Sequence, residues 1–124
     1  MIQFFKCKKC GKVLEVVNKG CPVVVCCGDE MTELKANTSD GATEKHVPVI
    51  ESNGNTVTVK VGSAVHPMEE DHYIQWIEIE TSRGVQRKYL KPGEEPKAEF
   101  SLTGESLVAA YELCNKHGLW KAEA

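Results

Sequence analysis

The sequence lacks the features that mark membrane-spanning proteins, secreted proteins and general nucleic-acid binders. No apolar stretch approaches the roughly 18 residues of a membrane-spanning helix, and residues 1–6 are too short for the apolar core of a signal peptide. We therefore expect a cytoplasmic protein. Basic residues are not in surplus, because 15 Lys and Arg stand against 18 Asp and Glu, with a net charge of -3. This balance argues against a general nucleic-acid binder.

Internal repeats and low-complexity tracts are also missing, so the chain is expected to fold as ordinary globular structure. Its 124 residues suffice for one domain, or for a very small domain joined to a modest one. The polar, glycine-containing stretch 37–43 is the expected linker. The predicted domains are therefore residues 1–36 and residues 37–124.

Six cysteines are present, and their spacing favours metal binding over disulfide bonds. Cys7 and Cys10 form a Cys-x-x-Cys pair, while Cys26 and Cys27 are adjacent, and the four sulfurs can surround one ion tetrahedrally. Without an export signal, a disulfide scaffold is disfavoured. A closed four-thiolate site would store an electron or hold structure, and the spacing leaves zinc and iron open as its metal. Cys21 is interpreted as a spare, partly buried thiol.

The first 36 residues are rich in turns and contain only brief strands. They are too few to bury a sufficient apolar core alone, so a metal or a partner must stabilise them. The strands expected here are 4–6 and 13–17, and the apolar run 23–25 leads into Cys26 and Cys27.

Beyond the linker the pattern is mainly that of β-strands. Turn residues at 52–55 and 81–84 predict two hairpins. The segment 106–113 fits both a helical face and an alternating strand, and its all-β surroundings favour a strand. Short strands at this spacing predict an antiparallel sandwich. The other expected strands are 47–51, 56–61, 73–80, 85–90 and 98–102.

The chain has only four histidines, and each lies beside a turn or a strand end. Any one of them alone would be read as an ordinary surface or hydrogen-bonding residue. A cysteine, Cys114, precedes the last histidine by three residues, and a soft thiolate with several imidazoles suits a redox transition metal. The histidines are His46, His66, His72 and His117.

Two other metal sites compete for these residues. A blue-copper site needs two histidines, one thiolate and a weak axial methionine. Cys114-x-x-His117 fits its ligand loop and Met68 could be the axial ligand, but no methionine follows His117 and two histidines would have no role. A non-haem iron site of two histidines and one carboxylate would leave the thiolate unused.

Six motifs, in order along the chain, strongly resemble the desulfoferrodoxin family, the two-iron superoxide reductases of anaerobic or microaerophilic prokaryotes. Cys21 is outside this pattern. The resemblance implies a small desulforedoxin-like domain, then an immunoglobulin-like antiparallel β-sandwich or barrel, paired as a homodimer. The motifs are Cys7-Lys-Lys-Cys10-Gly11, Val25-Cys-Cys-Gly28, Glu44-Lys-His-Val-Pro48, His66-Pro-Met68, Asp71-His-Tyr73 and Cys114-Asn-Lys-His-Gly-Leu-Trp120.

The resemblance also implies the ligands of two iron ions. The first iron would be held by Cys7, Cys10, Cys26 and Cys27. The second would have four imidazoles in a plane, an axial thiolate and an open sixth position. Its ligands would be His46, His66, His72, His117 and Cys114.

The implied activity is the one-electron reduction of superoxide to hydrogen peroxide, a detoxifying reaction under oxidative stress. Lys45 would attract superoxide and order proton-delivering water. Glu44 would be the carboxylate that occupies the sixth position after oxidation. Rubredoxin or a similar small carrier would donate the electron, and the first iron would either relay that electron or only stabilise the fold.

The sequence is therefore consistent with three classes of protein. The leading one is an enzyme, a superoxide reductase with two irons. The second is an electron carrier that combines a rubredoxin-like and a cupredoxin-like site and has no substrate. The third is a zinc-stabilised binding domain with incidental histidines.

Overall fold

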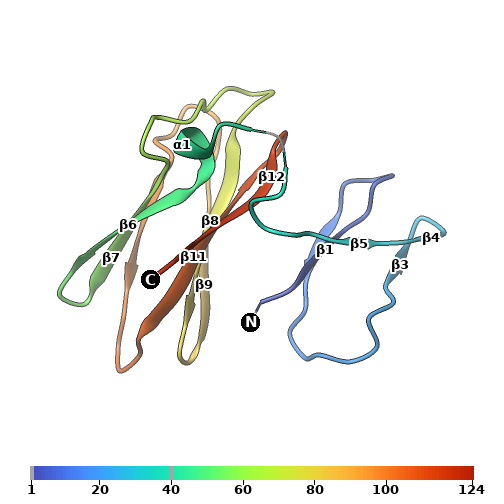
Figure 1. Cartoon of the computed structure of the whole chain (residues 1–124), viewed down its shortest axis with the longest axis horizontal. Helices are drawn as coiled ribbons and strands as arrows, with labels where there is room; N and C mark the ends of the chain where they lie inside the picture. Colours follow the sequence, from blue (N-terminus) through green and yellow to red (C-terminus); the bar gives the residue numbers. More distant parts are fainter. Residues whose placement is uncertain (1, 40) are drawn as a thin grey trace. The chain divides into compact units, whose positions relative to one another are not determined.

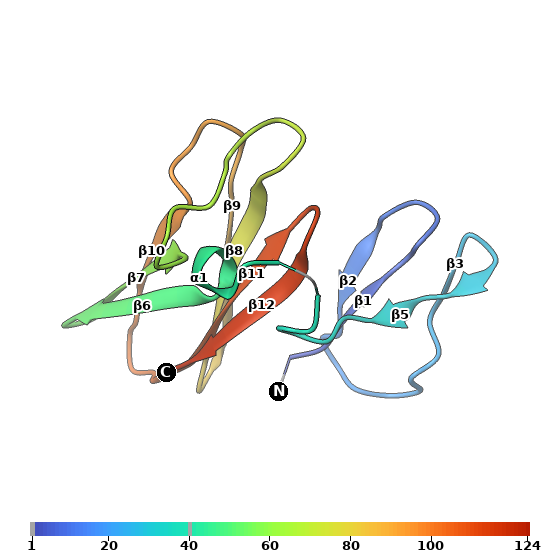
Figure 2. The same ribbon diagram turned by 45° about the horizontal axis from the view of Figure 1, so that its top comes forward.

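The computed structural model describes residues 2–39 and 41–124. The chain divides into two compact units, Met1–Lys35 and Ala36–Ala124, and Figures 1 and 2 show both from two directions. Strands dominate both units, and the mainly β fold predicted from the sequence is confirmed. In the described residues no helix is long and apolar enough to cross a membrane.

The first unit contains a three-stranded antiparallel sheet and a separate short hairpin. Its small core is formed by Phe5, Cys7 and Met31. One metal-binding cysteine therefore belongs to the core itself, as expected for a unit with little apolar surface. The sheet has the order β2-β1-β5, and the hairpin pairs β3 with β4. The bounds are β1 Phe4–Lys6, β2 Val13–Glu15, β3 Val25–Cys26, β4 Asp29–Glu30 and β5 Thr32–Glu33.

The second unit is an antiparallel sandwich of a three-stranded and a four-stranded sheet, preceded by one helical turn, α1 (Thr43–His46). The sheets have the orders β10-β7-β6 and β12-β11-β8-β9. Figure 2 shows β6 and β7 running across the strands of the other sheet. The bounds are β6 Pro48–Asn53, β7 Thr56–Val61, β8 Ile74–Thr81, β9 Gly84–Tyr89, β10 Lys97–Ser101, β11 Leu107–Cys114 and β12 Gly118–Glu123.

One apolar core joins the two sheets of the sandwich. On β7 the valines alternate with polar residues, so Val57, Val59 and Val61 all point into the core while Thr56 and Lys60 face solvent. This is the period-2 pattern of a half-buried strand. Strand β10 of the same sheet adds Phe100, and strands β8 and β11 of the other sheet supply the opposing core residues, which include Ile77, Ile79 and Ala110.

The structure decides the ambiguous segment and adds several elements that the sequence reading missed. Residues 107–114 form β11, which pairs with β8 on one side and β12 on the other. The prediction of a strand there is confirmed. The missed elements include the short strands β4 and β5, the strand β12, and the helical turn α1, which lies at the end of the predicted linker.

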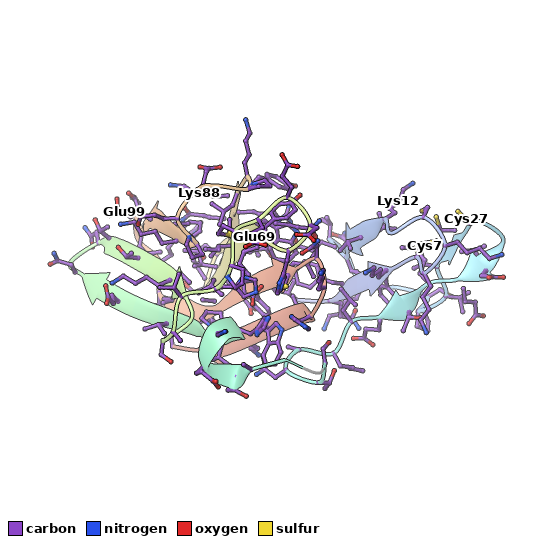
Figure 3. The ribbon with its side chains drawn as sticks, turned by 90° about the horizontal axis from the view of Figure 1, so that it is seen from above. Cys7, Lys12, Cys27, Glu69, Lys88 and Glu99 are labelled. Carbon is purple, nitrogen blue, oxygen red and sulfur yellow. The ribbon has the colours of Figure 1, made fainter. Side chains whose placement is uncertain are left out.

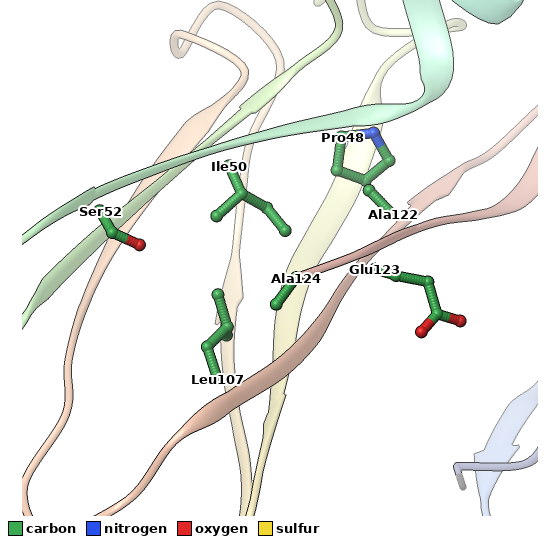
Figure 4. Close-up of a pocket in the computed structure, with 7 residues that line it drawn as sticks. All are labelled: Pro48, Ile50, Ser52, Leu107, Ala122, Glu123 and Ala124. Atoms are coloured by element: carbon green, nitrogen blue, oxygen red, sulfur yellow. The ribbon is translucent and has the colours of Figure 1, made fainter.

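A cavity of about 380 Å³ opens in the second unit where edge strand β6 faces β11 and β12 (Figure 4). It contains no imidazole or thiol, so the predicted metal chemistry is located elsewhere in the unit. Its lining residues are Pro48, Ile50, Ser52, Leu107, Ala122, Glu123 and Ala124.

Candidate metal centres

The second unit gathers all four histidines and Cys114 into one group, here called the histidine–cysteine cluster. One ligand atom from each residue lies within 4.8 Å of all the others. The residues come from turns or strand ends that are far apart in the sequence. His46 ends α1, His66 follows β7, His72 precedes β8, and His117 lies in the turn between β11 and β12.

The four imidazole rings form a closed cycle around a common centre. Going around the cycle, ring centroids are 4.6 Å apart for His46 and His66, and 4.8 Å for His66 and His72. They are 5.0 Å apart for His72 and His117, and 4.7 Å for His117 and His46. Neighbouring rings stand nearly perpendicular, so each can turn a nitrogen edge toward the centre.

Backbone carbonyls select which nitrogen of two imidazoles faces the centre. Nδ1 of His46 lies 2.8 Å from the carbonyl oxygen of Ala42, and Nδ1 of His66 lies 2.6 Å from that of Pro67. Because a carbonyl only accepts, both Nδ1 atoms carry the proton and both Nε2 atoms keep a free lone pair. This choice depends on hydrogen-bond partners in the folded chain and is not predictable from residue order.

These free nitrogens lie close enough to share one ion. His46 Nε2 is 3.1 Å from His66 Nε2 and 3.0 Å from His117 Nδ1. Two metal–nitrogen bonds of about 2.1 Å at a right angle place their nitrogens about 3.0 Å apart. Nε2 of His72 is buried and has no hydrogen-bond partner among the described residues. Unprotonated nitrogens facing one another at these distances repel unless a cation lies between them, so the residues fit a metal ion.

Burial keeps the imidazoles in their metal-binding form. Desolvation is the largest cause that lowers the pKa of His46 and of His72, and it lowers the pKa of His66 to about 4. All three are therefore neutral near pH 7, as a metal ligand must be. His46 and His66 are buried, whereas His72 is partly exposed.

Cys114 is buried, with 1% of its surface exposed. Burial raises the pKa of its thiol, so the free thiolate is disfavoured without a nearby cation. The amide of His117 donates to its Sγ at 3.4 Å and offsets part of this cost. The indole of Trp120 stacks on His46 and donates to the His117 carbonyl at 2.9 Å, which holds the turn in place.

Asn115 was not singled out from the sequence, yet it anchors the loop that carries His72. Its side-chain oxygen accepts from the amide of Tyr73 at 2.9 Å, and its side-chain nitrogen donates to the carbonyl of Asp71 at 2.9 Å. Asn115, the residue after Cys114, thus holds the backbone on both sides of His72. The only sequence signal was its place inside the Cys-Asn-Lys-His motif.

Glu112 is a second residue that the sequence reading missed. It is fully buried on β11, two residues before Cys114, and both carboxyl oxygens have no hydrogen-bond partner among the described residues. Desolvation raises its pKa well above the usual value. Burial therefore favours the uncharged form of this carboxyl group.

Glu44 and Lys45 lie on α1 immediately before His46, and both side chains are exposed. They are thus next to a metal-binding imidazole in the chain. Met68, the axial ligand of the copper alternative, packs against the apolar core, and its Sδ accepts from the amide of Ile74 at 3.4 Å. All four imidazoles converge with Cys114, whereas a blue-copper site uses only two, so the geometry argues against the copper alternative.

The first unit gathers the other ligands into the four-cysteine cluster, which consists of Cys7, Cys10, Cys26 and Cys27. Their sulfurs all lie within 4.8 Å of one another, with Cys10 and Cys26 at 3.7 Å. Figure 3 labels Cys7 and Cys27 at this cluster. Gly11 follows the first pair, and its φ of 81° lets the chain turn back, so that its amide donates to the Cys7 carbonyl at 2.9 Å.

The acidity of these thiols also indicates a cation. The backbone amide of Cys10 is the largest cause that lowers the pKa of Cys7 to about 6. Hydrogen bonds to neighbouring sulfurs raise the pKa of Cys26 to about 12, and they also raise that of Cys27. Four thiolates can therefore coexist only around a positive ion. Cys21 is outside the cluster, and it is exposed rather than partly buried as predicted.

The fold and the two clusters define a class of protein: a metalloprotein with one four-thiolate site on a small sheet and one four-imidazole, one-thiolate site on an antiparallel sandwich. Family models described as desulfoferrodoxin, N-terminal domain, and desulfoferrodoxin match residues 1–34 and 38–123, respectively. The chain belongs to the desulfoferrodoxin family.

Individual relatives match along nearly the whole chain. The chain is 52% identical over 122 residues to a desulfoferrodoxin homolog of Archaeoglobus fulgidus, covering 98% of this chain and 97% of the relative. It is 51% identical over 122 residues to the desulfoferrodoxin of Nitratidesulfovibrio vulgaris, covering 98% and 96%. The crystal structure of the superoxide reductase from Treponema pallidum superposes with a TM-score of 0.83 at 35% identity, covering 99% of both chains.

Proposed function

We propose that the protein is a superoxide reductase, an oxidoreductase that converts superoxide to hydrogen peroxide at the histidine–cysteine cluster. The observation that carries this function is the closed cycle of four imidazoles with a buried thiolate beside it. A relative named superoxide reductase, from Pyrococcus horikoshii, is 35% identical over 111 residues, covering 75% of this chain and 96% of that protein.

The reaction consumes one superoxide, one electron and two protons, and yields one hydrogen peroxide. An iron ion held by the histidine–cysteine cluster would supply the electron and a position at which superoxide could bind. The chain supplies four neutral imidazoles and a single negative charge from Cys114, so a divalent ion keeps a net positive charge that favours an anionic substrate. The thiolate adds electron density to the site and so favours loss of the electron.

Two exposed residues of α1 are assigned roles in this reaction. Lys45 provides a mobile positive charge next to His46, which draws superoxide in and orders water for proton delivery. Glu44 would provide a carboxylate that could take the place of the substrate at an oxidised metal ion. Residues 37–124 are thus the catalytic domain, and residues 1–36 hold the other iron in the four-cysteine cluster.

The function is tested by giving the reduced, iron-loaded protein a pulse of superoxide. We expect one hydrogen peroxide per superoxide consumed and no evolution of oxygen, with two irons per chain by metal analysis. An electron carrier without this activity would leave superoxide to decay at the rate of the buffer. Oxygen evolution would indicate a dismutase instead.

The variant Lys45→Ala is expected to slow the reaction with superoxide about tenfold at low salt and much less at high salt. Attraction between an exposed charge and an anion is screened once the Debye length falls to a few ångströms. The measurement is the second-order rate constant as a function of ionic strength. Lys60→Ala, an exposed lysine on β7, is the matched control. Equal slowing of Lys45→Ala at every ionic strength would refute the steering role.

We further propose that a small one-electron carrier of the rubredoxin type reduces the oxidised protein. Cys10 and Cys27 of the four-cysteine cluster are exposed, so a carrier can approach this cluster closely. Stopped-flow mixing of reduced rubredoxin with the oxidised protein measures the transfer directly. The absence of electron transfer would exclude this donor.

We also propose a homodimer in the cytoplasm, as the family resemblance implies. No disulfide bond joins any of the six cysteines, all of which are among the described residues, and this suits a reducing compartment. Sedimentation equilibrium of the iron-loaded protein should return twice the chain mass of 13.7 kDa. A single-chain mass at micromolar concentration would contradict the dimer.

A further inference from the structure

The four-residue helix α1 is held by the turn that follows β7. The carbonyl of Glu44 accepts two hydrogen bonds from this turn, one from the amide of Ala64 at 2.8 Å and one from the hydroxyl of Ser63 at 3.2 Å. Both bonds end on the backbone of α1, one residue before Lys45 and two before His46. The position of the helix is therefore fixed by residues 62–64, here called the α1 support.

Gly62 is the point at which this support touches α1 most closely. A Cβ added to Gly62 would lie 2.6 Å from the Glu44 carbonyl oxygen, 2.8 Å from the carbonyl carbon of Lys45 and 3.0 Å from the amide nitrogen of His46. All three atoms belong to the backbone, so no flexible side chain can move aside. Gly62 does not have a positive φ, so the absence of a side chain matters here for space.

The same turn also carries a second metal-binding imidazole. The amide of His66 lies 3.4 Å from the carbonyl oxygen of Val61, which closes the turn between β7 and His66. His46, at the end of α1, presents its Nε2 at 3.1 Å from the Nε2 of His66. The contact at Gly62 therefore links the elements that supply two adjacent ligands of the cycle.

We propose that Gly62 is a positioning residue of the metal site: its lack of a side chain lets α1 lie against residues 62–64 and so sets His46 at bonding distance from the ion that His66 also binds. A side chain at position 62 pushes the α1 backbone away and moves His46 with it. The inference rests on the proposed function only in that the histidine–cysteine cluster binds a metal ion. It involves no superoxide chemistry.

The test is a cobalt(II) titration of the full chain, because cobalt absorption bands report ligand geometry and distinguish the two clusters. In Gly62→Ala, we expect cobalt affinity at the histidine–cysteine cluster to fall at least about tenfold, the size found when groups that support metal ligands are removed. The d–d bands of that site should shift. The thiolate–cobalt bands of the four-cysteine cluster should stay unchanged and serve as an internal control. Wild-type affinity and wild-type bands in a folded Gly62→Ala protein would overturn the proposal.

Gly20→Ala is the matched control variant. Gly20 also lacks a positive φ, and a Cβ added there meets no atom within 4 Å, so both clusters should bind cobalt as in the wild type. Circular dichroism checks that the Gly62→Ala chain is folded.

A second variant, Ser63→Ala, keeps the space at Gly62 and removes one hydrogen bond to α1. It should weaken cobalt binding at the histidine–cysteine cluster by about two- to fivefold, as loss of one hydrogen bond implies. If Gly62→Ala does not fold, unchanged binding by Ser63→Ala overturns the proposal. A wild-type chain that binds cobalt only at the four-cysteine cluster would instead contradict the metal site on which the proposed function depends.

Discussion

Replacement of Cys114 by serine is expected to lower the rate of superoxide reduction at least about 100-fold while leaving the iron of the four-cysteine cluster in place. A serine hydroxyl stays protonated where a metal-bound cysteine is a thiolate, and its oxygen is a harder, weaker donor. The histidine–cysteine cluster would lose its one negative ligand. An iron ion bound there would then give up an electron less readily. Superoxide consumption and the reduction potential of the second iron are the measurements.

Cys21→Ser is the matched control for this variant, since Cys21 is an exposed thiol outside both clusters. It should leave turnover and both metal sites unchanged. Normal turnover in Cys114→Ser would overturn the role of the thiolate as the electron donor to the site. Loss of iron from both clusters would point to misfolding and not to the ligand.

The variant His66→Ala is expected to lower the iron content from two ions per chain to one. His66 is 1% exposed and faces two neighbours in the imidazole cycle, so its loss removes a ligand that water cannot readily replace in a buried site. Removing a residue that only supports a ligand already weakens metal binding by about 10–100-fold. Removing the ligand itself should weaken metal binding further.

Iron analysis after gel filtration, together with the visible spectrum of each site, provides the measurement for His66→Ala. The four-cysteine cluster is the internal control, because its ligands all lie in the first unit. Two irons per chain in the variant would show that the four-imidazole cycle is not the second iron site.

The sequence alone identified the ligands of the four-cysteine cluster from local spacing. Cys7-x-x-Cys10 and the adjacent pair at Cys26 place sulfurs together over a few residues, so their chemistry can be read without a fold. The histidine–cysteine cluster was harder to predict. His46 and His117 are separated by 71 residues, and only the resemblance between six ordered motifs and a known family joined them.

Strand prediction succeeded where side chains alternate and failed where they do not. The valines of β7 alternate with polar residues, so the strand over 56–61 could be read directly. Strand β11 is buried along most of its length, and its residues fit a helix equally well. Hydrogen-bonded pairing with β8 and β12 determines that this segment is a strand. The helical turn α1 was missed because four residues carry too little periodicity, and contacts with residues 62–64 hold it in place.

By itself the sequence determined the chemistry of this protein: which soft and nitrogen ligands it carries, which of them are paired locally, and that its second part is built from short strands. These properties follow from residue identity and from spacing over a few positions. Only the tertiary structure decided that Nε2 of His46 and of His66 faces the centre, that Asn115 anchors the His72 loop, and that Gly62 supports α1. Hydrogen bonds and close contacts of this kind form between segments distant in the chain, so they exist only after the sandwich has brought those segments together.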